Sequence, residues 1–126
     1  MLASWLLAAT LFLQFEPTWT AIGSRVVSDS TDHDTIVISA AQGSYRSVKI
    51  IVQRSPVRLH RLVLSFENGE RRELRLHELL PAGGETRIIH LKGAEQSIRG
   101  VDFWYDPKSV GHRGAVVQLV GREGQP

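Results

Sequence analysis

Arginine is the residue type in this chain whose number and spacing suggest chemistry. Of the 15 basic residues, twelve are Arg and three are Lys. Five of the arginines lie in residues 57–76, VRLHRLVLSFENGERRELRL. A guanidinium binds carboxylate and phosphate groups bidentately. The candidate contacts for an anionic partner are therefore Arg61, Arg71 and Arg75, with Arg72 near the turn.

The partner of such a stripe could be an anionic glycan, a lipid headgroup or an acidic protein. The stripe has an ordinary interpretation as well, because Glu67, Glu70 and Glu73 alternate with the arginines. Mixed charge of this kind is common on exposed sheet faces. A solvated face and an anion-binding face are thus both compatible with the pattern.

Metal-binding patterns are weak. Residues 28–34, SDSTDHD, offer oxygen ligands that could hold Ca²⁺, but the spacing is not that of an EF-hand and the terminal Glu is missing. Asp is also a common turn residue. The five histidines form no H-x-x-x-H or H-x-H pair, although His60 and His77 flank the same predicted hairpin. We therefore predict no metal site, either in this loop or among the five histidines, which are His33, His60, His77, His90 and His112.

Motifs of nucleophilic catalysis are absent from the sequence. The chain has no cysteine, which excludes thiolate zinc sites, iron–sulfur clusters and cysteine nucleophiles. It has no G-x-S-x-G elbow, and its Ser, His and Asp positions single out no triad. Paired carboxylates for glycoside chemistry are not excluded by spacing, but nothing marks a pair. We assign no catalytic residue and expect no cofactor.

The charge balance argues against a nucleic-acid partner. Lys plus Arg exceeds Asp plus Glu only by 15 to 13. A nucleic-acid footprint is a clustered basic patch with aromatic side chains that stack on bases. Here the aromatic residues follow the apolar pattern of the predicted strands instead.

The arginine stripe lies on a predicted β-hairpin, since Asn68-Gly69 between two strand-like runs is a strong hairpin signal. A two-residue loop would place Leu64 opposite Glu73 and mix apolar with charged residues on both faces. A one-residue shift moves every side chain to the other face, so burial selects the register that separates them. We therefore predict a three-residue loop, Glu67-Asn68-Gly69, with Gly69 in the left-handed conformation of a G1 bulge.

This register gives the hairpin two different faces. The apolar face would consist of Leu62, Leu64, Phe66, Leu74 and Leu76. The other face would consist of Arg61, Val63, Ser65, Arg71, Glu73 and Arg75. The first face is expected to join the core, and the second to be exposed.

Short strands separated by turn residues are expected along the rest of the chain. They are predicted at residues 19–28 (two short strands around Gly23), 34–39, 46–54, 86–91, 97–105 and 115–120. Residues 77–85 are predicted as a loop with room for one helical turn, and 106–114 as a loop. No segment shows a sustained helical period. The fold class is therefore all-β, a single β-sandwich or jelly-roll-like domain of about eight mainly antiparallel strands.

The N-terminal residues 2–15, LASWLLAATLFLQF, are typical of a signal-peptide core and too short to span a bilayer comfortably. The usual preceding basic residues are missing, and an uncleaved membrane anchor is the alternative. We expect a signal peptide at 1–18, the β-sandwich domain at 19–122 and a C-terminal tail at 123–126. The mature chain would be periplasmic or secreted, without a transmembrane segment.

Several motifs together resemble one family. They are W-x-x-[IL]-G at 19–23, D-T-I-V-I at 34–38, F-x-N-G at 66–69, P-A-G-G-E-T-R at 81–87, I-R-G-V-D-F-W-Y at 98–105 and the closing A-V-V-Q-L-V-G. This pattern resembles the YaaI-like group of small exported bacterial proteins of unknown function. The resemblance implies a signal peptide, a periplasmic or secreted location and an all-β domain. It implies no catalytic residue.

The function expected from the sequence is a non-enzymatic binding or interaction module of the bacterial envelope. The alternatives are a small envelope hydrolase with an unrecognised site and a structural or stress-related accessory protein. A deep pocket with a strongly perturbed carboxylate or histidine would favour the hydrolase. A flat arginine-rich or aromatic patch would favour binding.

Overall fold

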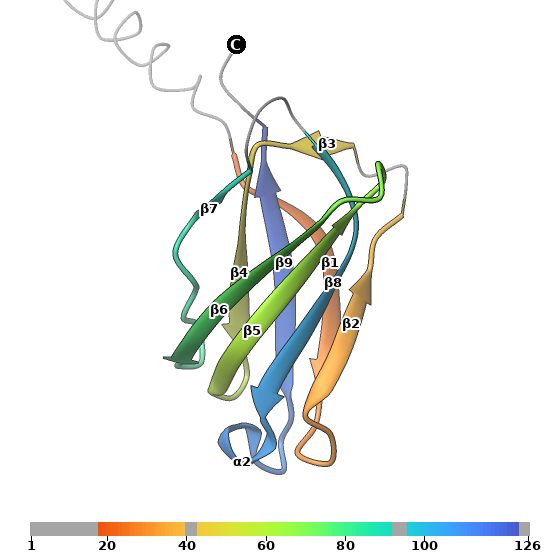
Figure 1. The fold of residues 1–126 in the computed structure, drawn as a ribbon. Helices are drawn as coiled ribbons and strands as arrows, with labels where there is room; N and C mark the ends of the chain where they lie inside the picture. Colours follow the sequence, from red (N-terminus) through yellow and green to blue (C-terminus); the bar gives the residue numbers. More distant parts are fainter. Residues whose placement is uncertain (1–17, 40–42, 92–95, 124–126) are drawn as a thin grey trace, which may run out of the picture.

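Two antiparallel β-sheets packed face to face make up the fold (Figure 1). The computed structural model describes residues 18–39, 43–91 and 96–123. The first sheet has the strand order β1-β9-β4-β7, and the second has the order β2-β8-β5-β6 with the short β3 also paired to β8. The all-β sandwich predicted from the sequence is confirmed. The strands are β1 Thr20–Val27, β2 His33–Val37, β3 Ser44–Tyr45, β4 Ser47–Gln53, β5 Val57–Phe66, β6 Arg71–Leu80, β7 Ile89–His90, β8 Gln96–Asp106 and β9 Ala115–Arg122.

The core lies between the sheets and is built by alternating residues of each strand. In β4, Val48, Ile50 and Val52 are fully buried, as their alternation predicts. In β8, Phe103 and Tyr105 face the same core and their rings lie 5.9 Å apart. Every second side chain of a strand therefore points into the core, and the side chains between them lie on the outer faces of the sheets.

The hairpin of β5 and β6 has the predicted three-residue loop. The amide of Phe66 donates to the carbonyl of Glu70 at 2.9 Å, and the amide of Gly69 donates to the carbonyl of Phe66 at 3.0 Å. Gly69 has φ +90°. In this register Leu62 pairs with Leu74, and Leu64 pairs with Arg72 rather than with Glu73. The predicted register is confirmed, and Leu62, Leu64, Phe66 and Leu74 are buried with Leu76 partly buried beside them. The expectation that the other face is exposed is wrong at Val63, which is only 8% exposed.

Gly69→Ala is expected to lower the free energy of unfolding by about 1 kcal/mol. A Cβ at Gly69 would meet no atom within 4 Å, so the cost comes from the left-handed φ alone. Urea denaturation followed by circular dichroism measures the change. Glu67→Ala in the same loop is the control and should change stability by less than about 0.5 kcal/mol. Equal stability of the Gly69→Ala variant and the wild type would contradict the expectation.

The boundaries of two predicted elements around β6 are wrong. Residues 77–80 are not a loop but continue β6, because Val57 pairs with Leu80 and buries it. The strand predicted at 86–91 is reduced to the two residues of β7. The residues just before β7 run beside β4 without forming a regular ladder with it. One of their hydrogen bonds runs from the amide of Ile50 to the Thr86 hydroxyl, at 3.0 Å.

Two further elements differ from the prediction. The two short strands predicted at 19–28 are one strand, β1, with a bulge between Ala21 and Gly23. The glycine marks a bulge rather than the end of a strand, because β1 pairs with β9 on both sides of it. The loop predicted at 106–114 contains the one-turn helix α2, Pro107–Val110, whose N-terminus is capped by the Asp106 carboxylate.

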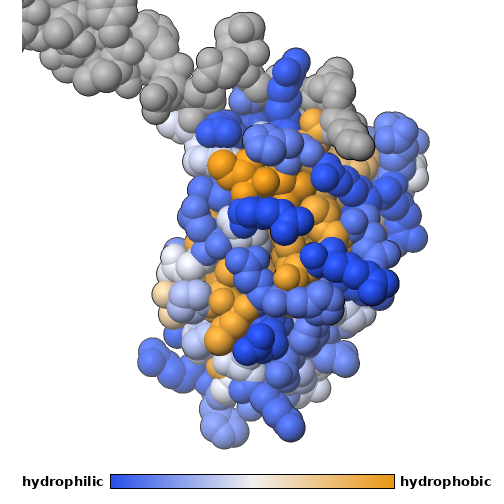
Figure 2. Space-filling model, turned by 60° about the vertical axis from the view of Figure 1, so that its left-hand side comes forward, coloured by the Kyte–Doolittle hydropathy of each residue, from blue (hydrophilic) through white to orange (hydrophobic). Residues whose placement is uncertain are grey.

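The side of the sandwich that carries β6 and β7 exposes some apolar surface between hydrophilic groups (Figure 2). Leu79 of β6 is 47% exposed, and Ile88 just before β7 is 38% exposed. The guanidinium of Arg72 reaches from β6 to the carbonyl of His90 on β7 at 2.6 Å. Arg72 thus links the two sheets at this open side instead of joining the outer arginine face.

The predicted signal peptide at 1–18 and tail at 123–126 fall almost wholly outside the described residues. Within the part of the chain that the structure does describe, no helix has the length and hydropathy needed to cross a membrane.

Candidate functional site

Side chains on the outer face of the β2-β8-β5-β6 sheet stand in rows that cross the four strands. Backbone pairing places four residues in one row, which we call the cationic row: His33, Trp104, Arg61 and Arg75. The next row toward the hairpin turn consists of Thr35, Asp102, Val63 and Glu73. These rows bring together residues from β2, the β5–β6 hairpin and β8, which are separate segments of the sequence.

A change of register in β5 places a second histidine, His60, beside the cationic row. Both Leu59 and Leu62 are fully buried although they are three residues apart. The pairing of β5 with β6 and with β8 shifts between Leu59 and Arg61. The bulge leaves two consecutive side chains, His60 and Arg61, lining the outer face.

The indole of Trp104 is covered on both sides. The ring of His33 stacks on it with centroids 4.5 Å apart and an interplanar angle of 26°. The Cζ atom of Arg61 lies 3.7 Å from the indole centroid. Strands β2 and β5 flank β8, so the imidazole and the guanidinium approach from opposite sides. The indole has no free face on which a ligand ring could stack, and its role here is to hold Arg61.

Glu73 orients the two arginines of the cationic row. Its Oε1 atom accepts a hydrogen bond from Nη1 of Arg61 at 3.4 Å and forms an ion pair with Nε of Arg75 at 3.4 Å. The side chains of Arg61 and Glu73 are 39% and 42% exposed, so these contacts add little stability. They bring the guanidiniums together while leaving most of their N–H donors unused by Glu73.

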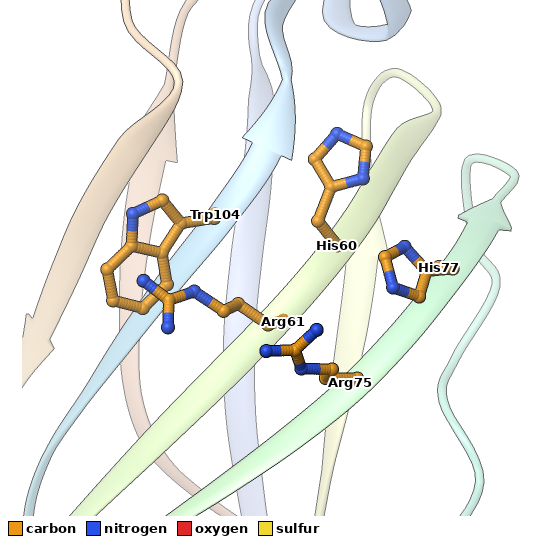
Figure 3. A pocket seen from close by; sticks show the side chains of 5 residues that line it. All are labelled: His60, Arg61, Arg75, His77 and Trp104. Carbon is orange, nitrogen blue, oxygen red and sulfur yellow. The ribbon is translucent and has the colours of Figure 1, made fainter.

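The cationic row borders an open pocket of about 320 Å³ (Figure 3). The residues that line it are His60, Arg61, Arg75, His77 and Trp104. In Figure 3 the side chains of Arg61 and Arg75 extend toward the indole from neighbouring strands, while the two imidazoles lie near the other end of the group. The centroids of the imidazoles are 6.0 Å apart. Guanidinium and imidazole groups arranged in this way can hold an anion.

A second hollow of about 530 Å³ adjoins the first and shares Arg61 and Trp104 with it. Arg71 and Glu73 belong to its lining. The guanidinium of Arg71 lies 4.0 Å from the Asp102 carboxylate. The two hollows are therefore neighbours on the outer face of the sheet, with Arg61 and Trp104 in the lining of both.

The structure places the three predicted arginines on the same face. Arg61 and Arg75 are direct cross-strand neighbours. Arg71 belongs to the second hollow, two rows nearer the turn. No motif in the sequence singled out Trp104, although the alternation that sends Phe103 inward sends Trp104 outward. The sequence contained no signal for the bulge that adds His60.

The acidic loop and the remaining histidines do not join this pocket. Within the described parts of the chain, no three metal-ligating side chains come together. Two acids of the loop have other partners, since Asp29 lies 3.2 Å from the imidazole of His112 and Asp34 forms an ion pair with Arg25 at 3.0 Å. His90 lies 3.4 Å from the Ser47 hydroxyl on the other sheet.

Comparisons with known proteins identify a family and a fold. The family model described as "Domain of unknown function (DUF2541)" matches residues 1–121. No match was found among curated proteins. Among solved structures, AlgX from Pseudomonas aeruginosa is similar at a TM-score of 0.57 and 16% identity, over 84% of this chain and 27% of AlgX. This chain thus spans about a quarter of the length of AlgX, and the likeness shows the fold alone.

Proposed function

The chain belongs to the family described as "Domain of unknown function (DUF2541)", and from this premise we propose that it is a non-enzymatic binding module of the bacterial envelope. Its ligand is an anionic group that binds on the outer face of the β2-β8-β5-β6 sheet. The apolar residues 2–15 and the resemblance to the YaaI-like group support export to the periplasm or beyond.

The proposal rests on the position of Arg61, which lines an open pocket while its guanidinium contacts two neighbouring side chains. Its guanidinium packs against Trp104 and is hydrogen-bonded to Glu73. An arginine held in this way loses less side-chain entropy when it binds an anion. Arg75 stands beside it on β6 with the same partner, Glu73. An open patch of arginine and aromatic side chains is the arrangement that favours binding over hydrolysis.

The double variant Arg61→Glu/Arg75→Glu tests the proposal. The purified protein is passed over immobilised dextran sulfate, with neutral dextran as the reference, at low ionic strength where exposed charges are least screened. We expect the variant to bind about tenfold or more weakly than the wild type. Hydrogen bonds to charged groups contribute about 1.5–3 kcal/mol each, and 1.4 kcal/mol corresponds to about tenfold in affinity.

A matched variant separates this face from the general charge of the protein. Arg87→Glu/Arg113→Glu makes the same change in net charge at two exposed positions outside the pocket lining. We expect this control to lose only a small part of the retention. Equal losses in the two variants, or no retention of the wild type, would contradict the proposal.

A further inference from the structure

The 320 Å³ pocket contains four basic side chains and, among the described residues, no carboxylate lines it. Two of the side chains are the arginines Arg61 and Arg75, and two are the histidines His60 and His77. A volume of this size is at the small end of the range for ligand pockets, about 300–1,000 Å³. The pocket therefore suits a small, highly charged group rather than a large apolar ligand.

Irregular backbone places both histidines at this pocket. His60 lies at the register shift of β5, and the facing segment of β6 has one residue more between its paired positions. His77 has φ +48°, a left-handed conformation that is uncommon for a residue other than glycine. Such conformations have an energetic cost and concentrate at functional sites. The outcome of the two irregularities is an imidazole pair beside an arginine pair.

An anion suits this group better than a metal ion does. Two imidazoles alone are an incomplete ligand set, and no third metal-ligating side chain joins them in the part of the chain that is described. The neighbouring guanidiniums of Arg61 and Arg75 would repel a cation. The same guanidiniums and protonated imidazoles would attract an anion from several directions.

We infer that this pocket binds one doubly charged tetrahedral oxyanion, of the sulfate or phosphate-ester class, and takes up protons on His60 and His77 as it does so. The inference rests on the proposed function and names the chemical class of its ligand. A single guanidinium satisfies both oxygens of a planar carboxylate. The four basic groups on β5 and β6 are more donors than one carboxylate can use, whereas a tetrahedral oxyanion has enough oxygens to accept from all of them.

The coupling to protons follows from the charges around the pocket. Arg61 and Arg75 together with Glu73 leave one net positive charge, and each protonated histidine adds one more. Histidine is the side chain whose charge can change within the range of about pH 5 to 8. Two protonated imidazoles with centroids 6.0 Å apart repel each other unless an anion compensates them.

Other charged groups surround the pocket but do not line it. Among the nearby carboxylates, Glu73 contacts the pocket arginines Arg61 and Arg75, Asp102 accepts from the Thr35 hydroxyl, and Asp106 accepts from the α2 amide of Lys108. The charged or titratable neighbours by element are His33 on β2, Arg58 on β5, Glu73 and Glu78 on β6, Asp102 and Asp106 on β8, and Lys108 on α2.

Calorimetric titration of the purified protein with sodium sulfate tests the inference, because sulfate keeps its charge between pH 5.5 and 7.5. We expect binding to strengthen about fivefold or more from pH 7.5 to 5.5 as the histidines gain protons. Titrations at pH 6.5 in buffers of different ionisation enthalpy should show an uptake of about one proton per sulfate bound. Acetate should bind more weakly than sulfate at every pH. Inorganic phosphate and methyl phosphate, compared at one pH, distinguish a free anion from an ester.

The double variant His60→Gln/His77→Asn provides the direct test. Asn tolerates the left-handed backbone at position 77, so the fold should be retained, and an unchanged melting temperature checks this. We expect the variant to bind sulfate at pH 5.5 as weakly as the wild type does at pH 7.5, with no proton uptake. His112→Gln is the control, since His112 pairs with Asp29 away from the pocket, and it should behave as the wild type does.

Three results would overturn the inference. They are sulfate binding that does not change with pH, proton uptake that survives in the double histidine variant, and acetate binding as tight as that of sulfate. None of them contradicts the proposed function as long as retention on dextran sulfate still requires Arg61 and Arg75. Loss of that requirement would instead contradict the proposed function itself.

Discussion

Replacing Phe103 by alanine is expected to lower the free energy of unfolding by about 3–5 kcal/mol, the range measured for buried Phe→Ala changes. Phe103 is fully buried in β8, which is an inner strand of its sheet. It pairs with Leu62 on one side and with Asp34 on the other. Domains of this kind have a total stability of only about 5–15 kcal/mol, so the loss could unfold a large fraction of the molecules. Urea denaturation followed by circular dichroism measures the effect.

Two further variants show whether the loss comes from the core cavity. Phe103→Leu keeps most of the buried volume and should cost much less than Phe103→Ala. Val37→Ala, on the neighbouring strand, removes a side chain that is 82% exposed and should change stability by less than about 0.5 kcal/mol. A loss below about 1 kcal/mol for Phe103→Ala would mean that the core is not packed as described.

Trp104→Ala is expected to weaken sulfate binding about fivefold to thirtyfold. The indole contributes a cation–π contact that holds Arg61, and such contacts are worth about 0.5–2 kcal/mol. Without the indole, the guanidinium must also be ordered when the anion binds. One or two kcal/mol corresponds to a factor of about 5–30 in an equilibrium constant. Titration with sodium sulfate at pH 5.5 measures the change.

The chain offers a matched control for this prediction. Trp19 also lies under cations, with Nζ of Lys49 at 4.3 Å and Cζ of Arg122 at 4.5 Å from its ring. These partners belong to the other sheet, so Trp19→Ala should leave sulfate binding unchanged. Trp104→Phe should restore part of the affinity, because a phenyl ring still offers a face to Arg61. Wild-type affinity in Trp104→Ala would show that the indole does not position the arginine.

The covered indole also bears on which ligands this face can recognise. Aromatic side chains on binding surfaces often serve as flat platforms, but both sides of Trp104 are already occupied by His33 and Arg61. Recognition at this site therefore depends on charge and hydrogen bonding.

Much of the fold follows from local patterns in the chain. The alternation of apolar residues in β4 and β8 was sufficient to assign their inward faces, and the parity of Leu62 and Leu74 was sufficient to choose the turn of the hairpin. The ends of β6 and β7 were not predictable in the same way. They depend on whether a partner strand is available, as Val57 is for Leu80 and as β4 is for Ile89.

The candidate site was likewise predictable in part from local patterns and in part only from the tertiary structure. The sequence by itself determined that Arg61, Arg71 and Arg75 share an outward face, because side-chain direction in a strand alternates with a period of two residues. Only the tertiary structure decided that β8 lies beside β5 and brings Trp104 against Arg61. The sequence also indicated that His60 and His77 flank the same hairpin, but only the tertiary structure decided that a register shift lets both line one pocket, because a bulge arises from competing demands of two neighbouring strands. Such demands act between residues that are distant in the sequence, and no local pattern in the chain records them.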